Sequence, residues 1–196
     1  MHDRIDAFKA HVKRASANPK FRHHTWFVKY HLEIVESIAS ELLTTYTDAD
    51  VDIVMVLVWL HDFGKTLDYD NQYETTLTAG RSKLNELGFD DAFIETVVGY
   101  AALIDQKLVI DLHEAPIEVQ IVSSADAASH HVGPFFHLYW WENPDMTPGE
   151  LMASNQAKTM KDWDRKMVLP EVRKAFEARH RAMLEQAGDF PGRFLP

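Results

Sequence analysis

Apolar residues recur at intervals of three and four along nearly the whole chain, and this spacing constrains the fold more than any other feature of the sequence. Residues three and four apart share one face of an α-helix, so the pattern predicts amphipathic helices. No repeat, low-complexity tract or Ser/Gly-rich linker divides the chain. The expected fold is an all-α, single-domain helical bundle over residues 1–196. Its helices are placed at about residues 3–16, 25–45, 49–62, 71–87, 90–106, 116–132, 148–166 and 169–187.

Composition excludes several classes of protein. The absence of cysteine rules out disulfide scaffolds and thiolate metal sites. With 20 basic against 30 acidic residues and no basic run, the chain is expected to repel nucleic acids. The longest apolar run, Ile53 to Leu60, is too short to span a bilayer, and Met1 to Arg14 lacks the apolar core of a signal peptide. We therefore expect a soluble, cytoplasmic protein.

A histidine on an apolar helix face gives the first indication of function. His31 shares one face with Phe27, Val35, Ile38 and Leu42, which are separated by helical steps of three and four. That face should point into the core, where an imidazole needs a polar partner. Taken alone, such a residue is most often a core histidine with one hydrogen bond. It becomes a candidate ligand only if other polar groups meet it.

Two carboxylates lie in equally apolar surroundings. His61 and Asp62 end the most apolar segment of the chain, 54–60, and Asp126 shares a helix face with Val122. Burying an ionised carboxylate costs several kcal/mol unless a cation or a hydrogen-bond network compensates it. If the helix end faces solvent, His61 and Asp62 need no further explanation. A neighbouring Lys or Arg would likewise compensate the Asp126 carboxylate.

One divalent cation explains all of these positions together. A helical bundle can bring side chains from three helices to one point. Two imidazoles and two carboxylates form a nitrogen and oxygen ligand set that suits Mn, Fe, Co, Ni, Zn or Mg. The sequence therefore predicts one divalent metal ion, bound by His31, His61, Asp62 and Asp126.

These residues also resemble a known signature. His31, the run His61-Asp62-Phe63-Gly64-Lys65 and, later, Asp126 between two alanines are similar to the H…HD…D signature of the HD-domain superfamily of metal-dependent phosphohydrolases. The similarity covers about residues 25–132, and the helices at about 148–187 are expected to pack on that core. The resemblance implies an HD-type helical bundle in which the same four residues ligate one divalent metal.

The resemblance further implies hydrolysis of a small phosphate ester or nucleotide. A divalent cation polarises a phosphoryl oxygen and lowers the pKa of water, so water can attack phosphorus near neutral pH. Asp62 is expected to ligate the metal and orient this water, and Lys65 to bind the phosphate as a catalytic and substrate-binding cation. His130, one turn beyond Asp126, is a further candidate for substrate contact.

Departures from the signature keep two other functions open. Family members with two metals place extra histidines after the HD pair, whereas here no histidine occurs between Asp62 and Leu112. Glu74 is the hard oxygen ligand that could replace one, so an HD-type di-iron oxygenase is the second hypothesis. The third is a non-catalytic HD fold that serves as a ligand-binding or interaction module. Lys65 occupies the position of a glutamate in the nucleotidase branch, so specificity for deoxynucleotides is not implied.

The aromatic segment Phe135–Trp141 is too dense for ordinary surface. It could be a helix packed in the core, a wall of the substrate pocket or a homodimer contact. The expected partner is accordingly a small phosphorylated substrate, and the homodimer contact adds a second copy of the chain as an alternative. Neither nucleic acid nor membrane is expected as a partner.

Overall fold

The computed structural model describes residues 1–193 and 195, and within them every regular element is helical. The expected all-α bundle is confirmed. The α-helices are α1 (His2–Ser16), α2 (Glu33–Leu43), α3 (Val51–Leu60), α4 (Gln72–Glu86), α5 (Asp91–Asp105), α6 (Ile117–Ser129), α7 (Phe135–Glu142), α8 (Pro148–Lys161) and α9 (Pro170–Gln186). Four short helical turns join them: η1 (Val28–Leu32), η2 (Phe63–Thr66), η3 (Leu112–Glu114) and η4 (Asp162–Lys166).

Local chemistry explains where the helices begin and end. Asp50 and Asp90 accept hydrogen bonds from backbone N–H groups in the first turns of α3 and α5. The Thr147 hydroxyl and the Glu150 carboxylate cap α8 reciprocally, as their spacing predicts. Gly88 ends the α4 segment with a φ of 76°, a left-handed conformation that glycine adopts without steric cost.

Three predicted segments differ from the structure. The helix expected at 25–45 contains a π-helical turn, η1, before α2, and the one expected at 148–166 ends in a second π-helical turn, η4. Residues 135–142 form α7, where the sequence favours a helix only as one of three alternatives, because a segment this rich in aromatic residues carries no amphipathic period. Periodicity cannot reveal a π-turn, which inserts one residue into an otherwise continuous helix.

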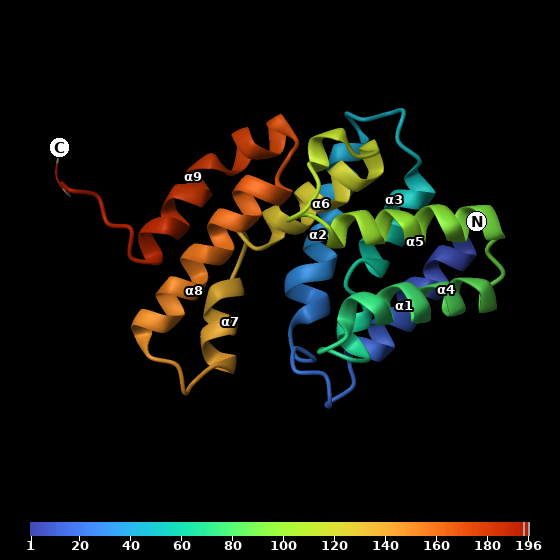
Figure 1. Cartoon of the computed structure of the whole chain (residues 1–196), viewed down its shortest axis with the longest axis horizontal. Coiled ribbons are helices and arrows are strands. Elements are labelled where there is room, and N and C mark those ends of the chain that lie inside the picture. Colours follow the sequence, from blue (N-terminus) through green and yellow to red (C-terminus); the bar gives the residue numbers. More distant parts are fainter. Residues whose placement is uncertain (194, 196) are drawn as a thin grey trace.

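The helices pack around one apolar cluster that extends from Ile5 on α1 to Val172 on α9. In Figure 1, α1, α4 and α5 lie at one end of the molecule, α7, α8 and α9 lie at the other, and α2 and α6 cross between them. Helix α2 packs against α6 and α3, and η4 joins α8 to α6. No helix in the described part of the chain is both long enough and apolar enough to cross a membrane.

Helix α4 approaches the turn after α3 so closely that only glycine fits. The backbone N–H of Gly64 donates to the Thr76 hydroxyl at 2.9 Å. A Cβ at Gly64 would lie 2.0 Å from the carbonyl oxygen of Gln72. This contact fixes η2, and with it the two residues before it, against the first turn of α4.

Candidate metal centre

Four residues predicted as ligands meet where η1, α3, η2 and α6 converge. His31 comes from η1, His61 ends α3, Asp62 precedes η2 and Asp126 lies in α6. The His31 Nε2 atom lies 3.3 Å from Asp62 Oδ2 and 3.7 Å from Asp126 Oδ1. The His61 Nε2 atom lies 3.7 Å and 3.9 Å from the same two oxygens. The helical faces read from the sequence thus bring all four groups together.

The hydrogen bond of His61 determines which of its ring nitrogens carries the proton. Its Nδ1 atom is 2.8 Å from the carbonyl oxygen of Val58, which can only accept, so Nδ1 carries the ring proton. Burial lowers the pKa of His61, against the opposing effect of Asp62 and Asp126, and keeps the ring neutral. Its Nε2 atom therefore presents a lone pair to two carboxylates. This buried atom has no hydrogen-bond partner among the described residues.

His31 is oriented in the same way. Its Nδ1 atom is 3.0 Å from the Ser129 hydroxyl, and that hydroxyl donates its own hydrogen to the Asp126 carbonyl oxygen at 2.7 Å. Ser129 must therefore accept from His31 Nδ1–H, so the other ring nitrogen, Nε2, faces Asp62. The lone pair on His61 Nε2 and the two carboxylates concentrate electron density at one point, which a cation between them would stabilise. The residues therefore fit a divalent metal ion.

Two lysines neutralise the carboxylates. Lys65 Nζ lies 2.5 Å from Asp62 Oδ2, the same oxygen that His31 and His61 face. Lys166 Nζ pairs with Asp126 Oδ2, the oxygen on the side away from the histidines. Burial alone would raise the pKa of both carboxyls, but these cations and the nearby histidines outweigh it and hold both well below their usual range. Both carboxylates are therefore ionised at neutral pH, as metal binding requires.

His130 belongs to the same cluster. Its Nε2 atom is 3.5 Å from Asp126 Oδ1, and its ring stacks on that of His31 with centroids 5.1 Å apart. Its Nδ1 atom is 2.9 Å from Asp162 Oδ2, on a carboxylate that is fully buried. Lys158 approaches the same carboxylate at 2.9 Å. Burial first, then Lys158, lowers the pKa of His130 to about 3, so this ring is neutral too.

A cavity of about 290 Å³ opens beside the cluster and is lined by all five of these imidazole and carboxylate residues. Six of the 20 lysines and arginines of the chain line it, against four of the 30 acidic residues. The basic residues are Arg22, Lys65, Lys107, Lys158, Lys161 and Lys166. An acidic protein therefore has a basic pocket, which favours anionic ligands.

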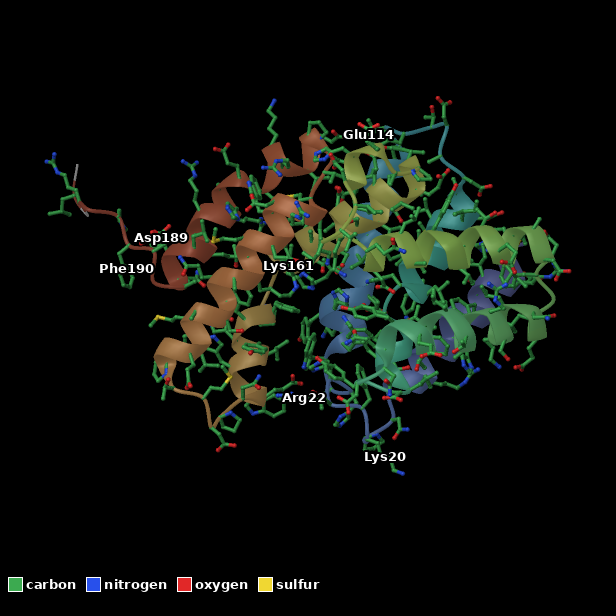
Figure 2. The ribbon with its side chains drawn as sticks, in the orientation of Figure 1. Lys20, Arg22, Glu114, Lys161, Asp189 and Phe190 are labelled. Carbon is green, nitrogen blue, oxygen red and sulfur yellow. The ribbon has the colours of Figure 1, made fainter. Side chains whose placement is uncertain are left out.

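Two of these cations are available to a ligand. Within the described residues, Lys107 and Lys161 have no ion-pair partner, and Lys107 instead lies over the Tyr73 ring at 5.7 Å. Lys161, at the end of α8, and Arg22, in the loop before η1, are both labelled in Figure 2. Arg22 is fixed by Asn143, whose side-chain oxygen it contacts at 2.6 Å.

Helix α7 forms one wall of this cavity. Phe135, Phe136 and Tyr139 line it, whereas Trp141 is exposed. The Glu142 side chain at the end of α7 accepts hydrogen bonds from the Trp26 indole at 2.5 Å and from His23 Nδ1 at 2.7 Å. The aromatic segment is therefore a pocket wall, anchored by a carboxylate to the loop before η1.

Glu74, the residue considered for a second metal, is exposed on α4 and does not line the cavity. A different carboxyl does. Asp105 ends α5 at the cavity, and its Oδ2 atom is buried with no hydrogen-bond partner among the described residues. Burial raises the pKa of Asp105 to about 7, although Lys107 acts in the opposite direction.

Sequence reasoning missed Lys158, Asp162 and Lys166, as well as Asp105. The first three follow one another at steps of four, which was the available signal, and η4 directs Asp162 and Lys166 inward together. In comparisons with known proteins, no family model, curated protein or solved structure matches this chain.

Proposed function

We propose that this protein is a cytoplasmic, metal-dependent phosphohydrolase of the HD-domain type, acting on a small phosphate ester or nucleotide. The observation that carries the proposal is the convergence of two buried imidazoles, His31 and His61, on the Asp62 and Asp126 carboxylates within 3.3–3.9 Å beside a basic cavity. Nitrogen and oxygen donors in this arrangement suit a divalent cation. The surrounding lysines suit the phosphate that such a cation activates.

The chain supplies groups for each part of the reaction. A divalent cation held by the cluster supplies Lewis-acid chemistry, because it polarises a phosphoryl oxygen and lowers the pKa of water. Lys65, adjacent to Asp62, is placed to bind a non-bridging phosphoryl oxygen. Lys107 and Lys161 add unpaired positive charge on the cavity wall. Asp62 accepts a hydrogen bond from the attacking water and thereby orients it.

Asp105 is our candidate for the proton donor. When water attacks phosphorus and the ester P–O bond breaks, the leaving oxygen takes up a proton. A carboxyl in the cavity with a pKa of about 7 carries that proton in a substantial fraction of molecules at neutral pH. The proton released by the attacking water then restores the acid through solvent.

The two alternatives receive less support from the residues. A di-iron oxygenase needs a second set of ligands, and Glu74, the residue that would supply one, points away from the cavity into solvent. A non-catalytic module has no need for uncompensated lone pairs in its core, since such groups cost stability.

Metal analysis followed by a substrate screen tests the proposal. Protein purified without chelator should contain about one divalent metal per chain, and loading it should allow hydrolysis of nucleotides or small phosphate esters. Asp62→Ala should remove both metal and activity while the circular dichroism stays helical. The matched control is Asp68→Asn, which changes an exposed carboxylate in the following loop that hydrogen-bonds Asn71.

Four results would reject parts of this assignment. No bound metal after reconstitution would leave the binding module, and about two irons per chain would favour the oxygenase. Full activity of Asp62→Ala would show that the site is elsewhere. Lys65→Ala should weaken phosphate binding while the metal is retained, so loss of metal there would contradict the role given to Lys65.

A further inference from the structure

We infer that His130 is a fifth metal ligand, so that the site has three imidazoles and two carboxylates and takes a transition metal rather than Mg²⁺. The inference rests on the proposed metal site and goes beyond the four ligands that the HD signature implies. It assigns a specific role to a residue that sequence reasoning considered only for substrate contact.

The geometry around one carboxylate oxygen carries the inference. Three imidazole Nε2 atoms approach Asp126 Oδ1: His130 at 3.5 Å, His31 at 3.7 Å and His61 at 3.9 Å. Bonds of about 2.0–2.2 Å to a first-row metal place neighbouring donor atoms roughly 3 Å apart. The three Nε2 atoms would therefore each have to move roughly 0.5–0.9 Å closer to Asp126 Oδ1 to share one ion with it. Of the three, His130 lies nearest to this oxygen.

In metal-ligating histidines, the ring nitrogen that does not bind the metal donates its N–H to a carboxylate, a carbonyl or another fixed acceptor. The Nδ1 atoms of the three histidines here each contact such an acceptor. His61 donates to the Val58 carbonyl and His31 to the Ser129 hydroxyl. His130 meets the Asp162 carboxylate, which is fully buried and forms an ion pair with the partly exposed Lys158. His130 Nδ1 lies 2.9 Å from this carboxylate, which can only accept, and 3.1 Å from Lys158 Nζ. The shorter contact favours the tautomer with the proton on Nδ1, which leaves Nε2 to bind a metal.

Burying the Asp162 carboxylate costs free energy of folding. A histidine with only a structural role would not require a buried carboxylate beside it. The Asp162 carboxylate has no exposed surface and is compensated by Lys158, by Lys166 at 3.6 Å and by His130. Burying such a charge costs several kcal/mol before compensation. The network orients His130 towards Asp126, which is the function expected of a residue that supports a metal ligand.

A fifth ligand changes which metals the site accepts. Imidazole suits Fe, Co, Ni and Zn, whereas Mg²⁺ prefers carboxylate, carbonyl and water. Three imidazoles therefore select against Mg²⁺. Five protein donors would also leave fewer coordination positions for water and substrate than four donors do.

The test counts imidazoles directly. Wild-type protein, stripped with chelator and loaded with one Co²⁺ per chain, is examined by X-ray absorption fine structure, which distinguishes three coordinated imidazoles from two. His130→Gln should lose one imidazole. The matched control is His131→Gln, which changes the next residue, a histidine that is equally buried but packs against His180 and hydrogen-bonds Ala127 instead.

Calorimetric titration with Co²⁺ and Mg²⁺ provides a second readout. His130→Gln should weaken Co²⁺ binding by more than the roughly 10–100-fold typical of residues that only support a ligand, whereas Asp162→Asn should fall within that range. His131→Gln should bind Co²⁺ like the wild type. All proteins should bind Co²⁺ much more tightly than Mg²⁺.

The outcomes separate this inference from the proposed function. Two imidazoles in the wild type, or an unchanged count and affinity in His130→Gln, would overturn the fifth ligand and leave the four-ligand hydrolase standing. A wild type that binds no Co²⁺ would overturn both. If His130→Gln fails to fold, the imidazole count in the wild type still decides between five ligands and four.

Discussion

Replacing Gly64 with alanine should damage both the fold and the metal centre. Gly64 follows the HD pair by two residues and packs against the first turn of α4. The added Cβ would lie 2.0 Å from the Gln72 carbonyl oxygen and 2.5 Å from the Thr76 backbone nitrogen. Both are backbone atoms that cannot rotate away, so η2 and α4 must separate.

The magnitude follows from two contributions. Overpacking a tightly packed contact costs about 1–3 kcal/mol. Separating the elements also weakens the hydrogen bond from the Gly64 N–H to Thr76, which contributes about 0.5–1.5 kcal/mol. We therefore expect Gly64→Ala to lower the free energy of unfolding by about 2–4 kcal/mol.

Gly80→Ala is the matched control, since it also adds one methyl group at a tight contact. Its Cβ would meet Leu60 Cδ1 at 2.3 Å, the end of a side chain that can change rotamer. Alanine in the interior of α4 also gains about 1 kcal/mol of helix propensity over glycine. The net cost of Gly80→Ala should therefore be smaller, about 0–2 kcal/mol.

Urea denaturation of the chelator-treated proteins measures both costs, with the slope m unchanged if the unfolding reaction is the same. Metal titration provides the functional readout. Gly64→Ala should bind the divalent cation more weakly because η2 carries Lys65 and adjoins Asp62, whereas Gly80→Ala should bind it normally. The reasoning is refuted if Gly64→Ala costs less than Gly80→Ala, or if the two variants bind metal equally well.

Three further predictions concern charge and metal. Burial raises the pKa of Asp105 to about 7, so the folded protein keeps a proton that the unfolded chain releases near pH 4. The free energy of unfolding therefore falls as the pH rises from about 4 to about 7. At pH 8 the free energy of unfolding of Asp105→Asn, measured with urea, should therefore exceed that of the wild type by about 1–3 kcal/mol after allowance for solvent screening. At pH 4 the two proteins should be equally stable. Equal stability of the two proteins at both pH values would contradict the shift. Glu142→Ala leaves the Trp26 and His23 donors without their acceptor, so it should cost about 2–4 kcal/mol and shift the tryptophan emission to longer wavelength, whereas an unchanged spectrum would show that α7 is anchored otherwise. Saturating the apo-protein with Co²⁺ at about 100 times Kd should add about 2.7 kcal/mol and raise Tm by roughly 5–11 °C, and no shift would exclude a metal that binds only the folded state.

Much of the fold can be predicted because it depends on local patterns. The buried side of α2, the caps of α8 and the glycine after α4 follow from spacing and residue type alone. The π-turns could not be predicted, since inserting one residue leaves the apolar period on either side intact.

The candidate site also contains residues that the sequence predicts and residues that it does not. His61, Asp62 and Asp126 are conspicuous because each is a polar residue in an apolar surrounding. Lys158 and Asp162 were overlooked because they lie in a polar stretch, where charged residues four apart usually indicate a solvated helix face. Only the packing of η4 against α6 shows that Asp162 is buried, and that packing joins segments more than 30 residues apart.

The two π-turns make the site sensitive to the length of the chain in a way that the core is not. In η1 the Glu33 N–H bonds to the Val28 carbonyl, and in η4 the Met167 N–H bonds to the Asp162 carbonyl, five residues back in both cases. Deleting one residue from either turn would allow a regular α-helix and preserve the apolar periods on both sides. A π-turn uses about one residue more per turn than an α-helix, so the deletion would leave the segments before and after it in nearly the same orientation. Only the side chains within the shortened turn would change direction. A chain one residue shorter at either place could therefore fold into the same bundle and no longer direct His31, or Asp162 and Lys166, at the metal centre.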